Sequence, residues 1–184
     1  MDNKPLAEIL RPTTLNDFVG QEHIVGKDGI ISSLLKNGEK TNYFPSLILW
    51  GPPGCGKTTL ARLIALELKR PFIEFSAVNA SIKEIEKEIT SFSQSKKLTL
   101  LEETKPVKLS GTPIIFIDEI HRFNKAQQDA LLPHVEQGKF ILIGATTENP
   151  SFEVIGPLLS RTRVVILKQL SQPFLLHLLQ NNQV

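Results

Sequence analysis

Residues 51–58 read Gly51-Pro52-Pro53-Gly54-Cys55-Gly56-Lys57-Thr58 and match the phosphate-binding loop pattern G-x-x-x-x-G-K-[ST] in full. Glycines let backbone N–H groups approach a phosphate without a Cβ clash, and a helix beginning near Lys57 adds the positive end of its dipole. The pattern predicts that Lys57 reaches the β- and γ-phosphates of a nucleoside triphosphate, and that Thr58 ligates Mg²⁺. The predicted nucleotide-binding set within this loop extends from Gly51 through Thr58 to Thr59.

The flanks of this loop alternate short apolar runs with helix-like runs, a pattern typical of βαβ units around a parallel sheet. The expected strands are Ser46–Trp50, Phe72–Val78, Pro113–Ile117, Lys139–Ala145 and Arg163–Leu167. The expected helices are Lys57–Lys69, Ser81–Phe92 and Lys125–Gln137. Pro133 is expected to kink the last helix or to end it early. The sequence therefore predicts an α/β fold, a three-layer P-loop NTPase core with a five-stranded parallel sheet.

Two acids follow the most apolar of these strands. Asp118 and Glu119 end the run Ile114-Ile-Phe-Ile-Asp-Glu, 60 residues or more after the P-loop lysine. The carboxyl edge of a parallel sheet is where ligands bind, so Asp118 is predicted to hold the Mg²⁺ shell. Glu119 is predicted to polarise an attacking water as general base. A second acid at this place favours hydrolysis over phosphoryl transfer to a small molecule.

Polar residues also follow the fourth strand and precede the fifth. A hydroxyl of Thr146 or Thr147 could lie beside the γ-phosphate and orient the water, although a turn or a helix cap explains these threonines as well. Arg161 and Arg163 could both be surface charges. Alternatively, one of them could be an arginine supplied to another active site. Such an arginine accelerates phosphoryl transfer by roughly 10³–10⁵-fold.

Composition excludes several other classes of protein. The chain has 184 residues, 41% of them hydrophobic, and a formal net charge of 21 − 19 = +2, which does not indicate a nucleic-acid binder. One cysteine cannot form an internal disulfide, which excludes a disulfide-stapled secreted domain. No apolar run approaches the roughly 18 residues of a membrane span. We therefore expect an intracellular protein without a membrane partner.

The remaining candidates are expected to have structural roles. Cys55 occupies a variable position of the loop and is predicted to be a small filler. The histidines lack metal-ligand spacing: they are His23, His121, His134 and His177. Arg122, Lys125 and Lys139 are predicted to be solvated rather than to touch a phosphate backbone.

The combination of motifs resembles a known family. Arg11-Pro-Thr-Thr-Leu-Asn-Asp-Phe-Val-Gly-Gln21, followed by the P-loop, Asp118-Glu119, Gly144-Ala-Thr-Thr147 and Ser160-Arg161, resembles the AAA+ ATPase core. Ile48–Thr59, Ile120-His-Arg-Phe-Asn-Lys-Ala-Gln-Gln-Asp129 and Ile143-Gly-Ala-Thr-Thr-Glu-Asn-Pro-Ser-Phe152 are similar to the Werner helicase-interacting protein family, whose bacterial members are replication-associated recombination protein A.

This resemblance implies a role for each matching residue. Val19 and Gly20 would lie near adenine, and the Walker-B pair would be Asp118 and Glu119. Thr147 aligns with the first sensor. Arg161 aligns with the arginine finger that reaches a neighbouring subunit's ATP, so the resemblance implies a homo-oligomer.

The resemblance also implies cofactors, partners and a cellular compartment. The cofactors would be ATP and Mg²⁺. The partners would be DNA at a replication fork or a single-strand/duplex junction, and replication polymerase or helicase proteins. The compartment would be the nucleus in a eukaryote and the cytoplasm in a bacterium.

The expected domain organisation follows the same resemblance. Residues 1–44 would contribute to the adenine pocket, and residues 45–170 would form the ATPase core, with a surface insertion at 93–111. Residues 171–184 would begin a truncated helical lid, so this chain alone is expected to hydrolyse ATP slowly.

Three alternatives remain open at this point. The chain could be a clamp-loader or branch-migration type of AAA+ subunit, or another P-loop enzyme such as a small-molecule kinase. It could also be a truncated protein that binds nucleotide and partners without turnover.

Overall fold

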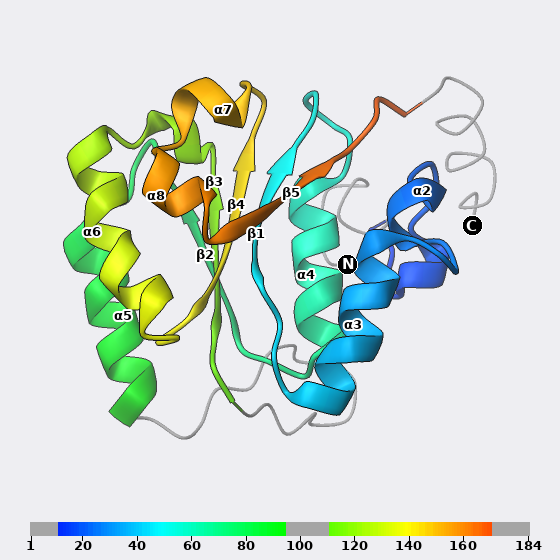
Figure 1. Cartoon of the computed structure of the whole chain (residues 1–184), viewed down its shortest axis with the longest axis horizontal. Coiled ribbons are helices and arrows are strands. Elements are labelled where there is room, and N and C mark those ends of the chain that lie inside the picture. The colour runs from blue at the N-terminus through cyan, green and yellow to red at the C-terminus, as the bar shows by residue number, and fades with distance from the viewer. Residues whose placement is uncertain (1–10, 95–110, 171–184) are drawn as a thin grey trace, which may run out of the picture.

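The structure, a computed structural model, describes residues 11–94 and 111–170. Within them lies a five-stranded parallel sheet (Figure 1), built from β1 (Ser46–Trp50), β2 (Phe72–Ser76), β3 (Ile114–Asp118), β4 (Ile141–Thr146) and β5 (Thr162–Ile166). The spatial order is β2-β3-β4-β1-β5, and each neighbouring pair is parallel. The predicted fold class is therefore confirmed.

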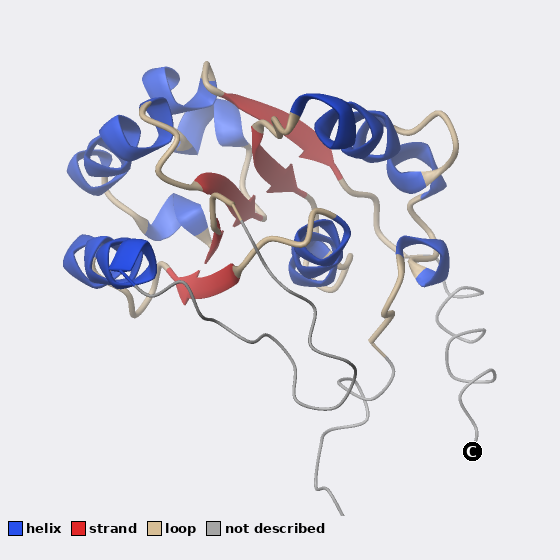
Figure 2. Ribbon diagram, turned by 90° about the horizontal axis from the view of Figure 1, so that it is seen from below, coloured by secondary structure: helices blue, strands red, loops and turns tan. Residues whose placement is uncertain are grey.

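Helices cover both faces of the sheet, as Figure 2 shows from below. One face packs against α3 (Ile30–Thr41) and α4 (Lys57–Glu67), and the other against α5 (Ile82–Gln94) and α6 (Lys125–Glu136). The shorter elements are η1 (Leu15–Asp17), α2 (Glu22–Val25), η2 (Ile120–Arg122), α7 (Pro150–Glu153) and α8 (Gly156–Leu159).

The central strands are apolar because both of their faces are covered. In β1, Leu47 and Leu49 belong to the core under α3 and α4, whereas Ile48 belongs to the core under α5 and α6. All three side chains are fully buried. Strands buried on both faces read as continuous hydrophobic runs, which is why the sequence located β1 without error.

Several predicted boundaries were wrong by a few residues. The second strand ends at Ser76 rather than Val78. The helix after the P-loop ends at Glu67, and Lys69 then adopts a left-handed φ of 52°. α6 runs through Pro133 to Glu136, so the proline does not end the helix. Pro133 lies at an exposed position, where its ring is in contact with solvent rather than with the core.

Two predicted regions lie largely outside the described residues. Of the expected insertion at 93–111, Ser93 and Gln94 belong to α5 and Gly111 precedes β3, while residues 95–110 are not described. The expected lid segment at 171–184 is not described either. Of the N-terminal segment expected at 1–44, residues 1–10 are not described, and residues 11–44 include α3, which the sequence did not predict.

A buried glutamine joins α6 to the chain that leads into β5. The Gln128 side chain is 1% exposed. Its Nε2 donates to the carbonyls of Phe123 (3.0 Å) and Glu153 (2.9 Å), and its Oε1 accepts from the N–H of Ile155 (2.9 Å). Because three backbone groups depend on this one side chain, Gln128 fixes the α7–α8 connection against α6.

We expect Gln128→Leu to lower the free energy of unfolding by about 2–3 kcal/mol. Leucine has a similar volume, but it leaves buried donors and acceptors without partners, and each such group costs about 1–3 kcal/mol. Urea denaturation followed by circular dichroism measures the change. The matched control is Gln137→Leu, at an exposed position just after the same helix, where we expect a change within about 0.5 kcal/mol. Equal effects of the two substitutions would contradict this role.

Candidate functional site

The loop between β1 and α4 has a backbone that only glycine adopts easily. Gly54 and Gly56 have φ values of 73° and 96°. A Cβ on Gly51 would lie 2.6 Å from the carbonyl oxygen of Leu167, and one on Gly56 would lie 2.8 Å from the ring of Phe18. The glycines are therefore required by the turn itself and by the segments packed against it.

Lys57 lies across this loop at the start of α4. Its Nζ donates to the carbonyls of Gly51 (2.8 Å) and Pro52 (2.9 Å). Gly56, the N-cap of α4, has no side chain that could accept from the first N–H groups of the helix. A cation and free helix N–H groups at one turn form a cradle for an anion, so the loop fits the triphosphate predicted from its sequence.

Cys55 is buried under the loop, with its Sγ 3.9 Å from Lys57 Nζ. Burial raises the pKa of the Cys55 thiol, and the nearby ammonium of Lys57 only partly opposes this effect. A thiol with a raised pKa is a poor nucleophile. The position agrees with the prediction of a small filler.

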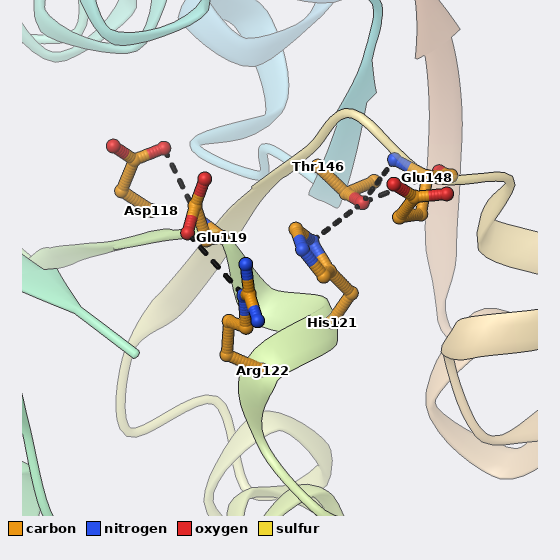
Figure 3. A network of polar contacts seen from close by, with 6 residues as sticks. All are labelled: Asp118, Glu119, His121, Arg122, Thr146 and Glu148. Atoms are coloured by element: carbon orange, nitrogen blue, oxygen red, sulfur yellow. Dashed lines mark hydrogen bonds and ion pairs between the residues drawn. The ribbon is translucent and has the colours of Figure 1, made fainter. Parts of the chain in front are cut away.

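The acid pair lies at the carboxyl end of β3, next to the P-loop lysine. Burial raises the pKa of Asp118, while the N–H of Glu119, which donates to Asp118 Oδ1 (3.1 Å), and the charge of Lys57 lower it. Glu119 has a left-handed φ of 53°, which costs a non-glycine residue roughly 1–2 kcal/mol. Its Oε2 lies 3.6 Å from Nε of Arg122 in a half-exposed ion pair (Figure 3).

The two threonines after β4 are in different environments. Thr146 is 1% exposed, and its Oγ1 accepts from the N–H of Glu148 (3.0 Å) and lies 3.0 Å from Nδ1 of His121 (Figure 3). Thr147 is partly exposed, and its hydroxyl has no hydrogen-bond partner within the described part of the chain. The carbonyl of Thr146 accepts from the N–H of Gly51 (3.2 Å), so this turn adjoins the P-loop.

The structure does not bring Arg161 to this site. It precedes β5 and therefore lies at the amino edge of the sheet, opposite the P-loop. Its guanidinium pairs with Glu136 and donates to the carbonyl of Pro157 (2.9 Å). A cavity of about 650 Å³ at this edge is lined by Arg161, Arg163 and Arg70 among others, and it is separate from the P-loop site.

The N-terminal segment packs directly on the P-loop. Gln21 is fully buried, and its Nε2 donates to the carbonyls of Lys168 (2.7 Å) and Cys55 (3.3 Å), while its Oε1 accepts from the N–H of Lys168 (3.0 Å). Val19 and Gly20, predicted near adenine, immediately precede it and are partly exposed. Gly20 has a φ of 81°.

Sequence reasoning missed three residues at this site: Phe18, Gln21 and His121. In the sequence, Phe18 and Gln21 stand out only as members of the motif Arg11–Gln21, and His121 lacks metal-ligand spacing, which favours a structural role. Its position two residues after Glu119 was a signal that it would lie near the acid pair.

The described residues contain no cluster of three or more His, Cys, Asp or Glu that could hold a metal ion by itself. A Mg²⁺ ion that depends on phosphate oxygens, Thr58 and Asp118 needs no such cluster, because Mg²⁺ binds through one or two protein groups plus substrate phosphates. In residues 11–94 and 111–170, no helix has both the length and the apolar character needed to cross a membrane.

A P-loop, an acid pair and a polar turn at one edge of a parallel sheet define a P-loop NTPase fold. The profile of the AAA family, "ATPase family associated with various cellular activities", matches residues 47–170, and the chain belongs to this family. Membership argues against the small-molecule kinase alternative.

Known proteins similar to the chain come from bacteria and a eukaryote. Replication-associated recombination protein A of Coxiella burnetii is 48% identical over 177 residues, which cover 96% of this chain and 36% of that protein. ATPase WRNIP1 of Dictyostelium discoideum is 46% identical over 168 residues, which cover 91% of this chain and 18% of that protein. The chain thus spans well under half the length of these relatives.

A solved structure has the same fold. The Holliday junction branch migration motor RuvB of Thermotoga maritima matches with a TM-score of 0.65 at 34% identity. The match covers 87% of this chain and 48% of that one.

We expect Gly56→Ala to destabilise the protein more than Gly54→Ala. Both substitutions strain a left-handed backbone by about 1 kcal/mol, but only the Cβ at residue 56 would overlap the Phe18 ring, which adds about 1–3 kcal/mol. Within 4 Å of a Cβ at residue 54 there is no atom of the described chain. Urea denaturation measures both changes in the free energy of unfolding. An equal decrease in the two variants would show that the Phe18 contact does not affect stability.

We expect Asp118→Asn to stabilise the nucleotide-free protein at pH 7. The pKa of Asp118 is raised in the folded state, so its ionised form costs folding free energy above that pKa, and this cost disappears as the pH falls toward the unfolded value of about 3.9. Asparagine does not ionise, and its Oδ1 still accepts from the N–H of Glu119. Unfolding free energies of both proteins between pH 5 and 8 test this. A stability gap that widens at low pH would contradict it.

Proposed function

We propose that the chain is an ATP-binding and ATP-hydrolysing module that acts on DNA in replication-fork maintenance and the DNA damage response. The observation that carries the proposal is the convergence of three groups at one sheet edge. Burial raises the pKa of Asp118, and Lys57 is close enough for its charge to oppose this rise in part. The Thr146 carbonyl accepts from the first N–H of the P-loop.

In the proposed mechanism, the loop from Gly51 to Thr59 and its lysine bind the phosphates. MgATP, when bound, supplies the phosphoanhydride bond that is cleaved. Thr58 and Asp118 would hold a Mg²⁺ ion, which would neutralise charge on the phosphates. Glu119 accepts a proton from the water that attacks the γ-phosphate, and its left-handed backbone turns η2 away from the end of β3.

Two further residues complete the proposed reaction. Thr147 contacts the γ-phosphate through a hydroxyl that is free within the described residues. Arg161 acts on the ATP of a neighbouring subunit. Its place at the opposite edge of the sheet supports action in trans rather than in its own site, so the proposed active unit is a homo-oligomer.

DNA and protein partners are proposed from the relatives, one of which is named for replication and recombination. The proposed partners are DNA at a fork or a single-strand/duplex junction, and replication polymerase or helicase proteins. Val19 and Gly20 are proposed to contact adenine. Because the relatives are both bacterial and eukaryotic, they leave the compartment open, whether nucleus or cytoplasm.

A second candidate function is that of a branch-migration subunit. The likeness to the RuvB motor favours it. We rank it lower because the relatives with higher sequence identity carry other names. Junction DNA as substrate would distinguish the two functions.

Glu119→Gln tests the proposed hydrolysis. We expect the affinity for ATP to change by less than about twofold and the rate of phosphate release to fall by roughly 10²-fold or more, because the variant keeps the phosphate cradle and loses the general base. Fluorescent-nucleotide titration and single-turnover phosphate release measure the two quantities. Glu39→Gln, an exposed acid on α3, is the matched control.

The outcomes separate the alternatives. Loss of ATP binding in Glu119→Gln would mean that Glu119 has been assigned the wrong role. ATP binding by the unmodified chain with no phosphate release at all would favour the non-catalytic alternative. We expect measurable release, since the phosphate-binding loop and the proposed general base both lie within the described residues.

A further inference from the structure

We propose that His121 is a positioning residue that, through Thr146, fixes the turn from which Thr147 reaches the γ-phosphate of ATP. The proposal rests on the proposed function and adds a residue to it. It is carried by the network in Figure 3, in which the His121 ring points at the Thr146 hydroxyl.

Thr146 and Thr147 cannot have the same role. The Thr146 hydroxyl has an N–H donor in Glu148 (3.0 Å), a carbonyl acceptor in Glu148 (3.2 Å) and the His121 ring at 3.0 Å. Thr146 is 1% exposed and its hydroxyl already contacts these three protein groups, so it is closed off from a ligand. Thr147, the next residue, is the threonine that remains available.

Thr146 holds the turn from residue 146 to residue 148 in shape. A threonine hydroxyl that accepts from the N–H two residues ahead closes a local turn, and here that N–H belongs to Glu148. The hydroxyl must also be kept in the right rotamer. The bond to His121 Nδ1 supplies this restraint from an element 25 residues away in the chain.

Either tautomer of His121 preserves the hydrogen bond between His121 Nδ1 and Thr146 Oγ1. If Nδ1 carries a proton, it donates to Oγ1, and the hydroxyl donates to the Glu148 carbonyl. If Nδ1 is unprotonated, it accepts the hydroxyl proton, and Oγ1 still accepts from the Glu148 N–H. The restraint therefore depends on the presence of the ring nitrogen rather than on which tautomer is present.

The hydrogen bond between His121 and Thr146 joins the segment after the acid pair to the turn after β4. His121 lies on η2, which begins directly after Glu119. The same short helix packs on β4, because a Cβ at Gly144 would lie 2.9 Å from Cδ1 of Ile120. One apolar contact and one hydrogen bond thus hold the turn after the acid pair against the strand that ends at Thr146, so a shift of either segment is transmitted to the other.

The test compares substitutions at both ends of the hydrogen bond in the full chain. His121→Phe keeps a ring but removes the nitrogen, His121→Asn offers a polar atom near the place of Nδ1, and Thr146→Val removes the hydroxyl. Thr162→Val, at a threonine on β5 whose hydroxyl donates to Leu159, is the matched control. For each, we would measure the affinities for ADP and for a non-hydrolysable ATP analogue, together with kcat and KM for ATP.

We expect His121→Phe and Thr146→Val to leave the ADP affinity within about twofold and to lower the preference for the ATP analogue over ADP by roughly fivefold, the equivalent of one hydrogen bond. We expect kcat to fall about tenfold and KM for ATP to rise by no more than the roughly fivefold loss of analogue affinity, because the γ-phosphate contact matters most in the transition state. His121→Asn should restore most of the loss. The double variant should be no worse than either single variant, because both remove the same bond.

Unchanged analogue preference and kcat in His121→Phe would overturn the proposal. So would an equal loss in His121→Asn and His121→Phe, or fully additive losses in the double variant. If instead the unmodified chain neither prefers the analogue nor releases phosphate, it is the proposed function that fails. A thermal unfolding scan of each variant shows whether the loss tracks stability, and a purely structural His121 would lower the affinities for ADP and the analogue together.

Discussion

The parallel pairing of β4 with β1 on one side and with β3 on the other is the constraint on which the site depends. The register places Trp50 opposite Thr146 and Ile117 opposite Gly144. Because the strands run in the same direction, the segments that follow them emerge at one edge. The P-loop, the acid pair and the threonine turn therefore meet there, although Gly51 and Thr147 are 96 positions apart in the chain.

The P-loop is held by segments that come from far away in the chain. Gln21 joins its backbone to Lys168, the Phe18 ring covers Gly56, and the Leu167 carbonyl lies where a side chain on Gly51 would be. These contacts connect the N-terminal segment, the nucleotide loop and the end of the sheet. Such a buried, fully bonded polar link specifies one arrangement of three segments, whereas an apolar contact would permit sliding.

The site is also where the chain carries unfavourable features. Glu119 has a left-handed backbone, Asp118 is buried enough to raise its pKa, and the first N–H groups of α4 have no side-chain cap. Each lowers the stability of the nucleotide-free protein, and each suits a site that receives a magnesium-bound polyphosphate. A strained backbone and a buried carboxylate persist only where the surrounding structure is rigid. Here the two apolar cores on either side of the sheet provide that rigidity.

The sequence by itself determined the fold class, the positions of the strands to within two residues, and the Lys57 and Asp118–Glu119 motifs, because glycine turns and doubly buried strands leave strong local patterns. It did not determine that α6 continues past Pro133, because the missing N–H and the ring of a proline predict a kink or an end, whereas the helix runs on to Glu136. Nor did the residues themselves separate Thr146 from Thr147, which only the family resemblance distinguished, or assign partners to Gln21 and His121. Adjacent threonines look alike in a sequence, and what distinguishes them is which one the neighbouring strand buries. Only the tertiary structure decided this, because the hydrogen bonds involved join residues 25 to 147 positions apart.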